Sequence, residues 1–359
     1  MKNISAVDLF CGAGGLTSGL ISAGIKVIAG FDVDSSCKHP YEHNNNAQFI
    51  ENDVSQVSAD ELNNYYPKES IKLLAGCAPC QPFSTYSQGR DAKKNSKWPL
   101  LYQFSRLIRE VEPELVTMEN VPDVIKHEVY HDFVKELTEQ EYHVWAGKVY
   151  CPDYGVPQIR SRHVLLASKF GRIEMLPKTH TPDKYLSVKE TIGNLPPISS
   201  GEQNIHDPLH RSAQLSDLNL RRIQASRQGG SWKDWPQELV AECHRRKSGK
   251  TYGGVYARMS WDKPSPTMTT QCYGFGNGRF GHPEQDRGIS LREAALLQSF
   301  PKEYEFIQKG ERLQMIRIGR MIGNAVPPRL GEVIGKTFLQ HLSEFSNNTN
   351  YKGLNIQAV

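Results

Sequence analysis

A short apolar run followed at once by a glycine-rich turn constrains the fold of this chain more than any other feature. The run Ile4 to Phe10 has the composition of a buried strand, and Cys11-Gly12-Ala13-Gly14-Gly15 follows it. Glycines in such a turn let backbone N–H groups approach a ligand without a Cβ in the way, at the start of the next helix. Together they predict the first βα unit of a nucleotide-type α/β fold. The alternative is a turn that only packs helix on strand.

An acidic residue after the next strand indicates the kind of ligand. Asp32 closes the run Val27 to Phe31, at about the spacing from which a carboxylate reaches the hydroxyl pair of a ribose. A dinucleotide fingerprint would have a further glycine at Thr17, and a Walker loop would have Gly-Lys-Ser/Thr, but the sequence has neither. The expected ligand is therefore a nucleoside without a pyrophosphate, and S-adenosylmethionine fits.

A third strand, Gln48 to Ile50, leads to a second acidic residue. Asp53 could accept a hydrogen bond from an adenine amino group, with Val54 against the ring face. A simple turn or an N-cap aspartate is equally consistent with the local sequence.

Cys80 follows a fourth apolar run, Ile71 to Leu74, in the loop Cys77-Ala78-Pro79-Cys80. Parallel α/β sheets keep reactive groups at the carboxyl ends of their strands, so we predict that Cys80 is a nucleophile. The alternative for one cysteine is a small buried hydrophobe. The CxxC spacing could also indicate redox activity or zinc, but zinc would need a second pair at ligand spacing, which the sequence lacks.

The polar stretch after Cys80 has no apolar periodicity and is rich in cations. Long loops of this kind are often lids, and a cationic lid beside a nucleophile suggests a phosphate-bearing substrate. A solvated, disordered loop is the alternative. The candidate contacts to such a substrate are Ser84, Gln88, Arg90, Lys93, Lys94 and Lys97.

Two further segments deliver polar groups to the same sheet. The run Leu115 to Met118 is followed by Glu119, which at a strand end is placed for proton transfer, although it could instead cap the next helix. Gln158, Arg160 and Arg162 alternate, which predicts one shared face of an extended segment that could clamp a phosphate or a base edge. An ordinary charged strand face is the alternative.

Composition limits the class of protein. With 359 residues, 38% apolar and 23% charged, the chain suits a soluble protein of two domains, or of one large domain with an insertion. No apolar stretch is long enough to span a bilayer. Seven scattered cysteines and a strand-like start without a signal peptide predict the cytoplasm. The net charge of +4 permits a nucleic-acid partner without requiring one.

The alternation of predicted strands and helices is lost between about Lys178 and Pro283. From Gln203 to Arg258 there are ten Lys and Arg against five Asp and Glu, interleaved with Trp232, Trp235, Tyr252 and Tyr256. Basic, aromatic and irregular sequence predicts an inserted recognition region, although a run such as 244–247 could be a solvated helix face. Order returns with the capping-box spacing of Ser290 and Glu293, then with helices over Leu313 to Ile322 and Arg329 to Leu342.

Six blocks in order resemble the cytosine carbon-5 DNA methyltransferase family, over about residues 4–335. They are Asp8-Leu9-Phe10-Cys11-Gly12-Ala13-Gly14-Gly15, Pro79-Cys80-Gln81-Pro82-Phe83-Ser84, Glu119-Asn120-Val121, Gln158-Ile159-Arg160-Ser161-Arg162, Arg292-Glu293 with Gln298-Ser299-Phe300-Pro301, and Gly323-Asn324-Ala325-Val326-Pro327-Pro328.

The resemblance implies a doubly wound, Rossmann-like S-adenosylmethionine-binding domain (1–175 plus 310–345). It also implies an inserted target-recognition domain (176–290), a hinge (291–309) and a flexible tail (346–359). The helix from about Leu313 would pack back beside the first strand. The implied cofactor residues are Phe10, Cys11, Gly12, Ala13, Gly14, Gly15, Leu16, Asp32, Val33, Asp53, Val54, Pro79, Leu100, Asn324 and Val326. Val33 departs from relatives that place an aromatic residue there to stack on adenine.

The implied chemistry uses four side chains on a cytosine that has been flipped out of duplex DNA. Cys80 adds to carbon 6, and Glu119 holds ring nitrogen 3 and the exocyclic amine. Arg162 would bind the carbonyl oxygen of the base. Arg160 would contact a phosphate or have a structural role. Arg258 and Arg279 are further candidate DNA contacts.

The expected partners are double-stranded DNA and a restriction endonuclease acting on the same site, and we expect a monomer. A branch of the family methylates tRNA, but the long basic insertion favours DNA. A non-catalytic DNA-binding relative is the other alternative, against which the intact Cys80, Glu119 and Arg162 argue.

Overall fold

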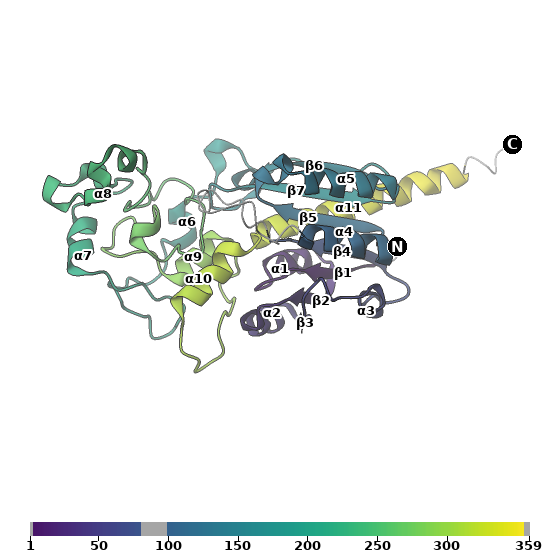
Figure 1. The fold of residues 1–359 in the computed structure, drawn as a ribbon, viewed down its shortest axis with the longest axis horizontal. Coiled ribbons are helices and arrows are strands. Elements are labelled where there is room, and N and C mark those ends of the chain that lie inside the picture. The colour runs from purple at the N-terminus through teal and green to yellow at the C-terminus, as the bar shows by residue number, and fades with distance from the viewer. Residues whose placement is uncertain (1–2, 80–98, 355–359) are drawn as a thin grey trace. The chain divides into compact units, whose positions relative to one another are not determined.

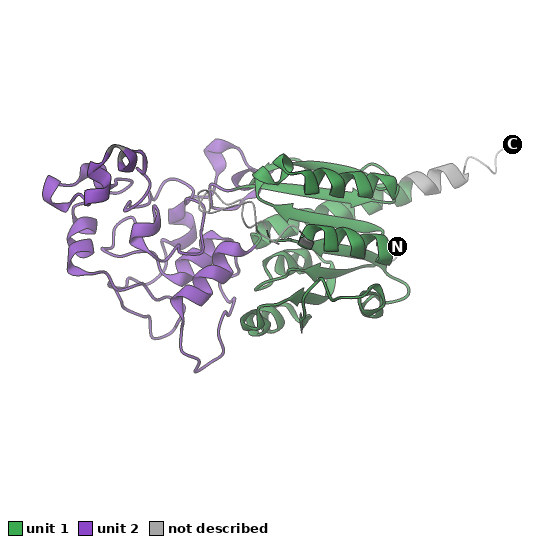
Figure 2. Ribbon diagram, viewed as in Figure 1, with its two compact units in different colours: residues 1–150, 161–178, 326–359 green, residues 151–160, 179–325 purple. Residues whose placement is uncertain are grey.

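The computed structural model describes residues 3–79 and 99–354 and divides into two compact units (Figures 1 and 2). Unit 1 comprises residues 1–150, 161–178 and 326–359, and unit 2 comprises 151–160 and 179–325. Two boundaries differ from the predicted ones. Residues 151–160 belong to unit 2, and the chain returns to unit 1 only at Val326, so the predicted hinge and the helix before Val326 also lie in unit 2.

Unit 1 is built on one seven-stranded sheet in the order β3-β2-β1-β4-β5-β7-β6. The strands are β1 (Ile4–Leu9), β2 (Lys26–Asp32), β3 (Gln48–Glu51), β4 (Ile71–Gly76), β5 (Leu115–Asn120), β6 (His143–Tyr150) and β7 (Ser161–Ser168). The first five pair in parallel, whereas β7 runs antiparallel to both β5 and β6. The amino-terminal end of β7 therefore lies at the edge where the five parallel strands end.

Alternation along β1 shows how the sheet is covered. Val7 and Leu9 belong to a core cluster with apolar residues of α3 (Ala59–Tyr65), α4 (Pro99–Val111) and α5 (Glu128–Glu139). Asp8 between them meets Thr17 of α1 (Gly15–Ser22). Helices therefore cover both faces, as expected for a doubly wound sheet. The unit also contains α2 (Lys38–Asn45) and α11 (Pro328–Leu354).

The last helix packs against the first. A Cβ on Gly19 of α1 would lie 2.5 Å from the backbone nitrogen of Glu332 and 2.6 Å from Cα of Gly331, both in α11. The absence of a side chain at residue 19 is therefore what allows the two helices to approach so closely. The first part of the tail predicted from residue 346 is helical, because α11 continues to Leu354.

Unit 2 has little regular structure in its described residues. Its α-helices are α6 (Val188–Ile192), α7 (Asp217–Gln224), α8 (Glu242–Arg245), α9 (Leu291–Leu297) and α10 (Met315–Asn324). The capping box predicted for Ser290 and Glu293 is confirmed at the start of α9.

The interleaved aromatic residues of unit 2 mainly form a core. Trp232 and Trp235 are buried with Phe275, and Tyr256 packs against this cluster. The guanidinium of Arg222 lies 5.5 Å from the ring centroid of Trp235 and 5.4 Å from that of Tyr256. Among the aromatics singled out in the sequence, Tyr252 is the one left mostly exposed, at 64%.

The contact between α1 and α11 predicts the effect of one methyl group. Alanine is favoured over glycine by about 1 kcal/mol in a free helix, but Gly19→Ala places a Cβ against the α11 backbone. We expect a loss of about 1–3 kcal/mol in the free energy of unfolding, measured with urea. Gly254→Ala is the control, because a Cβ there meets no described atom within 4 Å. Equal stability of the two variants would contradict the close packing.

Candidate active site

The glycine turn after β1 holds three residues in the left-handed region. Phe10 has φ 58°, Gly12 has φ 52° and Gly14 has φ 86°. A bulky residue in this region is strained, and such strain persists where the surrounding structure imposes it, often at functional sites. The turn is fixed by the Cys11 N–H, which donates to the Phe31 carbonyl at 3.1 Å. A Cβ on Gly12 would meet no described atom within 4 Å, so the turn presents its backbone to open space.

Asp32 connects this turn to the end of β2. Its Oδ2 accepts from the Gly12 N–H at 2.9 Å and its Oδ1 from the Asp34 N–H at 2.9 Å. Burial raises the pKa of Asp32 above its usual value. Beside it, the apolar side chain of Val33 is 66% exposed. A carboxylate with lone pairs remaining, next to an exposed apolar surface and an open backbone turn, suits the ribose and base of an adenosine.

The other predicted cofactor residues differ in their surroundings. Asp53 is exposed and its Oδ1 accepts from the Ser55 N–H at 2.8 Å, which is the turn predicted as its alternative role. Val54 is buried in the core of unit 1. The remaining residues are described by their exposure: Cys11, Ala13, Gly14, Gly15, Leu16 and Val326 are buried, Leu100 is half-buried, and Pro79 and Asn324 are exposed.

Asp8 is a buried acid that sequence reasoning passed over. Its Oδ2 accepts from the Thr17 hydroxyl at 2.7 Å, and that hydroxyl also lies 3.0 Å from the hydroxyl of Tyr41. Its Oδ1 has no hydrogen-bond partner among the described residues. Burial, with a smaller effect of the Asp32 charge, raises the pKa of Asp8 from 3.8 to about 7. An aspartate inside an apolar strand, as at position 8, was the available signal.

Glu119 and Arg162 form an ion pair where β5 and β7 meet. Nε of Arg162 lies 2.7 Å from Oε1 of Glu119, and the two side chains are 14% and 9% exposed. Nη1 of Arg162 also donates to the Ser161 carbonyl at 2.8 Å. The antiparallel pairing of β5 with β7 brings the start of β7 beside the end of β5, which is why residues 43 positions apart in the sequence become neighbours.

Cys77 is the cysteine of the CxxC pair that the structure describes. Burial raises the pKa of its thiol well above the usual value, and the charges of Glu119 and Asp8 add to the shift. A thiol held in its protonated form is a poor nucleophile, so Cys77 is suited to packing. Cys80 lies outside the described residues, as do Ser84, Gln88, Arg90, Lys93, Lys94 and Lys97.

Arg160 does not share the surroundings of Arg162, contrary to the prediction of one common face. It is buried in unit 2, where its Nη1 donates to the Met268 carbonyl at 3.0 Å and its Nη2 to the Gly323 carbonyl at 3.3 Å. Gln158 is also buried there, with Nε2 2.5 Å from Oε1 of Gln298. Strand β7 begins only at Ser161, so the alternation does not extend back to these residues. These contacts support the structural role that was one of the two predicted for Arg160, and its assignment as a catalytic residue stays a prediction.

Arg258, a predicted DNA contact, is also structural. Its buried guanidinium donates to the carbonyls of Ser226 and Gln285 at 2.9 and 2.7 Å and pairs with Asp286. Arg279 is half-buried, and its Nη1 donates to the carbonyls of Gly229 and Arg258 at 2.7 and 3.1 Å. These side chains join loops that have few backbone ladders of their own.

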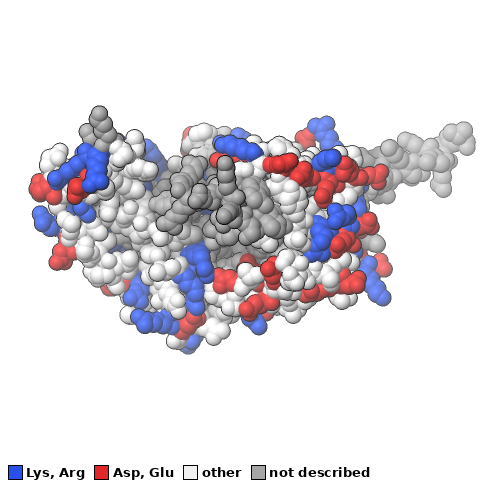
Figure 3. Space-filling model, viewed as in Figure 1, with Lys and Arg blue, Asp and Glu red and all other residues white. Residues whose placement is uncertain are grey.

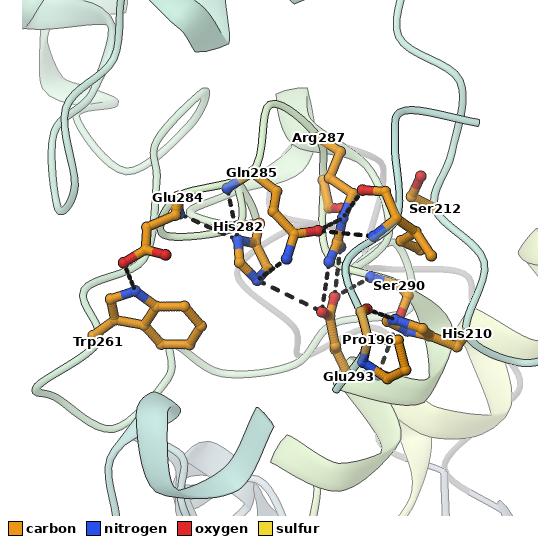
Figure 4. A network of polar contacts seen from close by, with 12 residues as sticks. Pro196, His210, Ser212, Trp261, His282, Glu284, Gln285, Arg287, Ser290 and Glu293 are labelled. Carbon is orange, nitrogen blue, oxygen red and sulfur yellow. Dashed lines mark hydrogen bonds and ion pairs between the residues drawn. The ribbon is translucent and has the colours of Figure 1, made fainter. Parts of the chain in front are cut away.

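A buried ion pair fixes the start of α9 in unit 2 (Figure 4). Arg287 donates to both carboxylate oxygens of Glu293, at 2.7 and 2.8 Å, and the Ser290 N–H donates to the same carboxylate at 2.6 Å. Burial alone would raise the pKa of Glu293, but the hydrogen bonds and charge of Arg287 outweigh it and lower the pKa to about 2. The Arg287–Glu293 pair is therefore charged at ordinary pH and holds segments of unit 2 together.

The fold and the edge residues together define a class of enzyme. Five parallel strands carry a glycine turn after β1, a carboxylate at the end of β2 and an acid–arginine pair where β5 meets the antiparallel β7, which suits an enzyme that binds a nucleoside and transfers a group beside it. Comparison with known proteins identifies the family. The model for C-5 cytosine-specific DNA methylases matches residues 4–340.

Curated relatives and solved structures agree with that match. The chain is 54% identical over 346 residues to the Type II methylase M.HgiDII of Herpetosiphon aurantiacus (95% of this chain, 97% of the relative). It is 30% identical to the Type II methyltransferase M1.HphI of Haemophilus parahaemolyticus (94% and 87%). A putative DNA modification methyltransferase from an E. coli prophage has the same fold, with a TM-score of 0.66 at 23% identity over 95% of this chain and 100% of that one.

The chain therefore belongs to the C-5 cytosine-specific DNA methylase family and is a DNA cytosine-5 methyltransferase that uses S-adenosylmethionine. Among the described residues, no helix has the length and apolar character needed to cross a membrane. On the face drawn in Figure 3, the described cationic and anionic side chains are intermixed.

The buried Asp8 predicts a dependence of stability on pH. Because its pKa is raised on folding, the folded state binds more protons between about pH 4 and pH 7, and ionising Asp8 lowers stability as the pH rises through that window. Asp8→Asn removes this effect. We expect the free energy of unfolding of Asp8→Asn, relative to that of the wild type, to be about 2–3 kcal/mol greater at pH 8 than at pH 5. Urea unfolding at both pH values measures it, and a constant difference would contradict the raised pKa.

Proposed function

We propose that this chain is the modification enzyme of a type II restriction–modification system, methylating carbon 5 of a flipped-out cytosine within a specific duplex site. The observation that carries the proposal is the 54% identity to a Type II methylase over nearly the whole of both chains. A cognate endonuclease would act on the same site without a stable complex. The enzyme would work as a cytoplasmic monomer.

The chemistry we assign to the chain begins with Cys80. Its thiolate adds to carbon 6 of the cytosine ring, forming a C–S bond and moving electron density to carbon 5, which becomes nucleophilic. Bound S-adenosylmethionine supplies the methyl group in an electrophilic form. A base then takes the proton from carbon 5, the ring double bond re-forms, and the C–S bond breaks to release Cys80.

Glu119 and Arg162 would act on the target base. Glu119 would bind ring nitrogen 3 and the exocyclic amine and share the proton that neutralises the ring as the thiolate adds. Arg162 would steady the carbonyl oxygen of the base. Their 2.7 Å ion pair supports this assignment, because each side chain restrains the other before the base arrives.

The glycine turn and Asp32 would hold the methyl donor. The open backbone of Gly12 and the position of Asp32 at the end of β2 support ribose binding, and the exposed Val33 supports contact with the adenine. The cations of the 84–97 segment would contact phosphates. Arg279 would also contact a phosphate, through guanidinium nitrogens other than Nη1, which donates to its own loops.

Bisulfite sequencing of DNA from cells that express the protein tests the proposed function. We expect methylcytosine at one position of one short sequence, and no modification in cells that express Cys80→Ala. Protection of plasmid DNA from an endonuclease that cuts that sequence would support the restriction–modification setting. Methylation confined to RNA, or wild-type methylation by Cys80→Ala, would overturn the proposal.

The role of Glu119 predicts a separation between chemistry and donor binding. Glu119→Gln keeps the shape of the side chain but cannot share a proton with the ring. We expect the single-turnover rate of methyl transfer to fall by about 10²–10⁴-fold, with little change in the dissociation constant of S-adenosylmethionine. Rapid-quench methylation and equilibrium binding measure the two quantities. A parallel loss of both would assign Glu119 to structure.

A further inference from the structure

The backbone pairing between β4 and β5 ends before the residues that carry the chemistry. Their parallel register runs from Leu73 opposite Leu115 to Gly76 opposite Met118 and then stops. Glu119 and Asn120 continue to pair with β7 but no longer with β4. From that point the backbone hydrogen bonds of the ladder no longer fix the segment 77–79 relative to Glu119.

The side chain of Asn120 spans this gap. Its Nδ2 donates to the carbonyl of Ala78 at 3.1 Å, and its Oδ1 accepts from the N–H of Val121 at 2.7 Å. Both polar atoms of the amide are thus engaged, and the side chain is enclosed, with the residue only 6% exposed. A buried amide with both atoms bonded has one defined orientation, so the distance between Ala78 and the end of β5 is set.

The groups on either side of this contact are also held. The N–H of Cys77 donates to the Leu9 carbonyl of β1 at 3.2 Å, so residues 77 and 78 are bonded to the strands on both sides. On the other side, Asn120 pairs with His163 of β7, and a ring nitrogen of His163 lies 2.7 Å from the Tyr130 hydroxyl. Asn120 therefore connects two segments that are each hydrogen-bonded to a further strand or helix.

We propose that Asn120 is a positioning residue that fixes the 77–79 segment, from which the chain continues to Cys80, at a set distance from Glu119. The inference rests on the roles proposed for Cys80 and Glu119. Because Asn120 follows Glu119 directly, one dipeptide would bind the base and anchor the segment leading to the nucleophile. A displacement of about 1 Å between reacting groups can slow a reaction on the order of 10²-fold, which is the scale of effect expected here.

The test removes and then restores the hydrogen that Asn120 donates to Ala78, which distinguishes a positioning role from a general contribution to stability. Asn120→Asp is isosteric but, once ionised, has no N–H or O–H to donate to Ala78. We expect the single-turnover methyl-transfer rate at pH 8 to fall about 10²-fold, with the dissociation constants of DNA and S-adenosylmethionine within about twofold of wild type. As the pH falls, protonation of the new carboxyl group restores an O–H donor. The rate relative to wild type should then recover about tenfold, the equivalent of one hydrogen bond.

Two further variants complete the design. Asn120→Ala lacks a donor at every pH, so it should be slow without any recovery at low pH. Asn45→Asp is the matched control: Asn45 is equally buried and its Nδ2 donates to the Tyr41 carbonyl at 2.8 Å, but it precedes the amino-terminal end of β3, on the other side from the edge where the strands end. It should lower the unfolding temperature and leave the methyl-transfer rate unchanged.

The results that would overturn the inference are distinct. A rate for Asn120→Asp within about twofold of wild type, or a slow rate with the same pH profile as Asn120→Ala, would remove the positioning role. Equal losses of rate in Asn45→Asp and Asn120→Asp would show that stability alone is responsible. Covalent trapping on DNA containing 5-fluorocytosine is measured in parallel. An adduct formed by Cys80→Ala would disprove the proposed function itself, whereas slow trapping by Asn120→Asp with none by Cys80→Ala supports both.

Discussion

The parallel register of the first five strands is the constraint on which the site depends. Because β1, β2, β4 and β5 all run the same way, their carboxyl ends lie at one edge, and each delivers one functional group to it. The glycine turn, Asp32, the 77–79 segment and Glu119 are far apart in the sequence and share only this property. The antiparallel β7 adds Arg162 from the opposite direction, since its amino-terminal end reaches the same edge.

The arginines of this chain show that residue type and spacing do not determine role. Arg162 ends on a carboxylate at the sheet edge, whereas Arg160, two residues earlier, ends on main-chain carbonyls inside unit 2. Arg258 and Arg287 likewise donate to main-chain carbonyls and so join loops of unit 2. Unit 2 contains little regular secondary structure, so its carbonyls need side-chain donors, and guanidinium groups with five N–H bonds supply them. Part of the positive charge that suggested DNA binding is therefore internal.

Most of the fold and the central site could be predicted because their signals are local. Four apolar runs are long enough to predict buried strands, and they begin at Ile4, Val27, Ile71 and Leu115. Glycine or acidic residues stand at or just after their ends. What could not be predicted depends on distant contacts. The separation of Arg160 from Arg162 follows from where β7 begins. The last turns of α11 run through the Asn-rich sequence from Ser346, whose residues are weak helix formers, so local propensity does not predict them. Asp8 and Asn120 gain their importance from neighbours in other strands and helices.

The contact of α11 with α1 has a consequence for synthesis of the protein. Residues that begin unit 1 are made first, yet the helix that covers α1 starts only at Pro328. During translation the face of α1 that includes Gly19 stays uncovered until all of unit 2 has emerged from the ribosome. Unit 1 can complete its packing only after that, so a nascent or truncated chain lacking α11 would lack the support beneath the glycine turn. In a cell, this order of events would couple the completed packing of α1 to a chain that already contains unit 2.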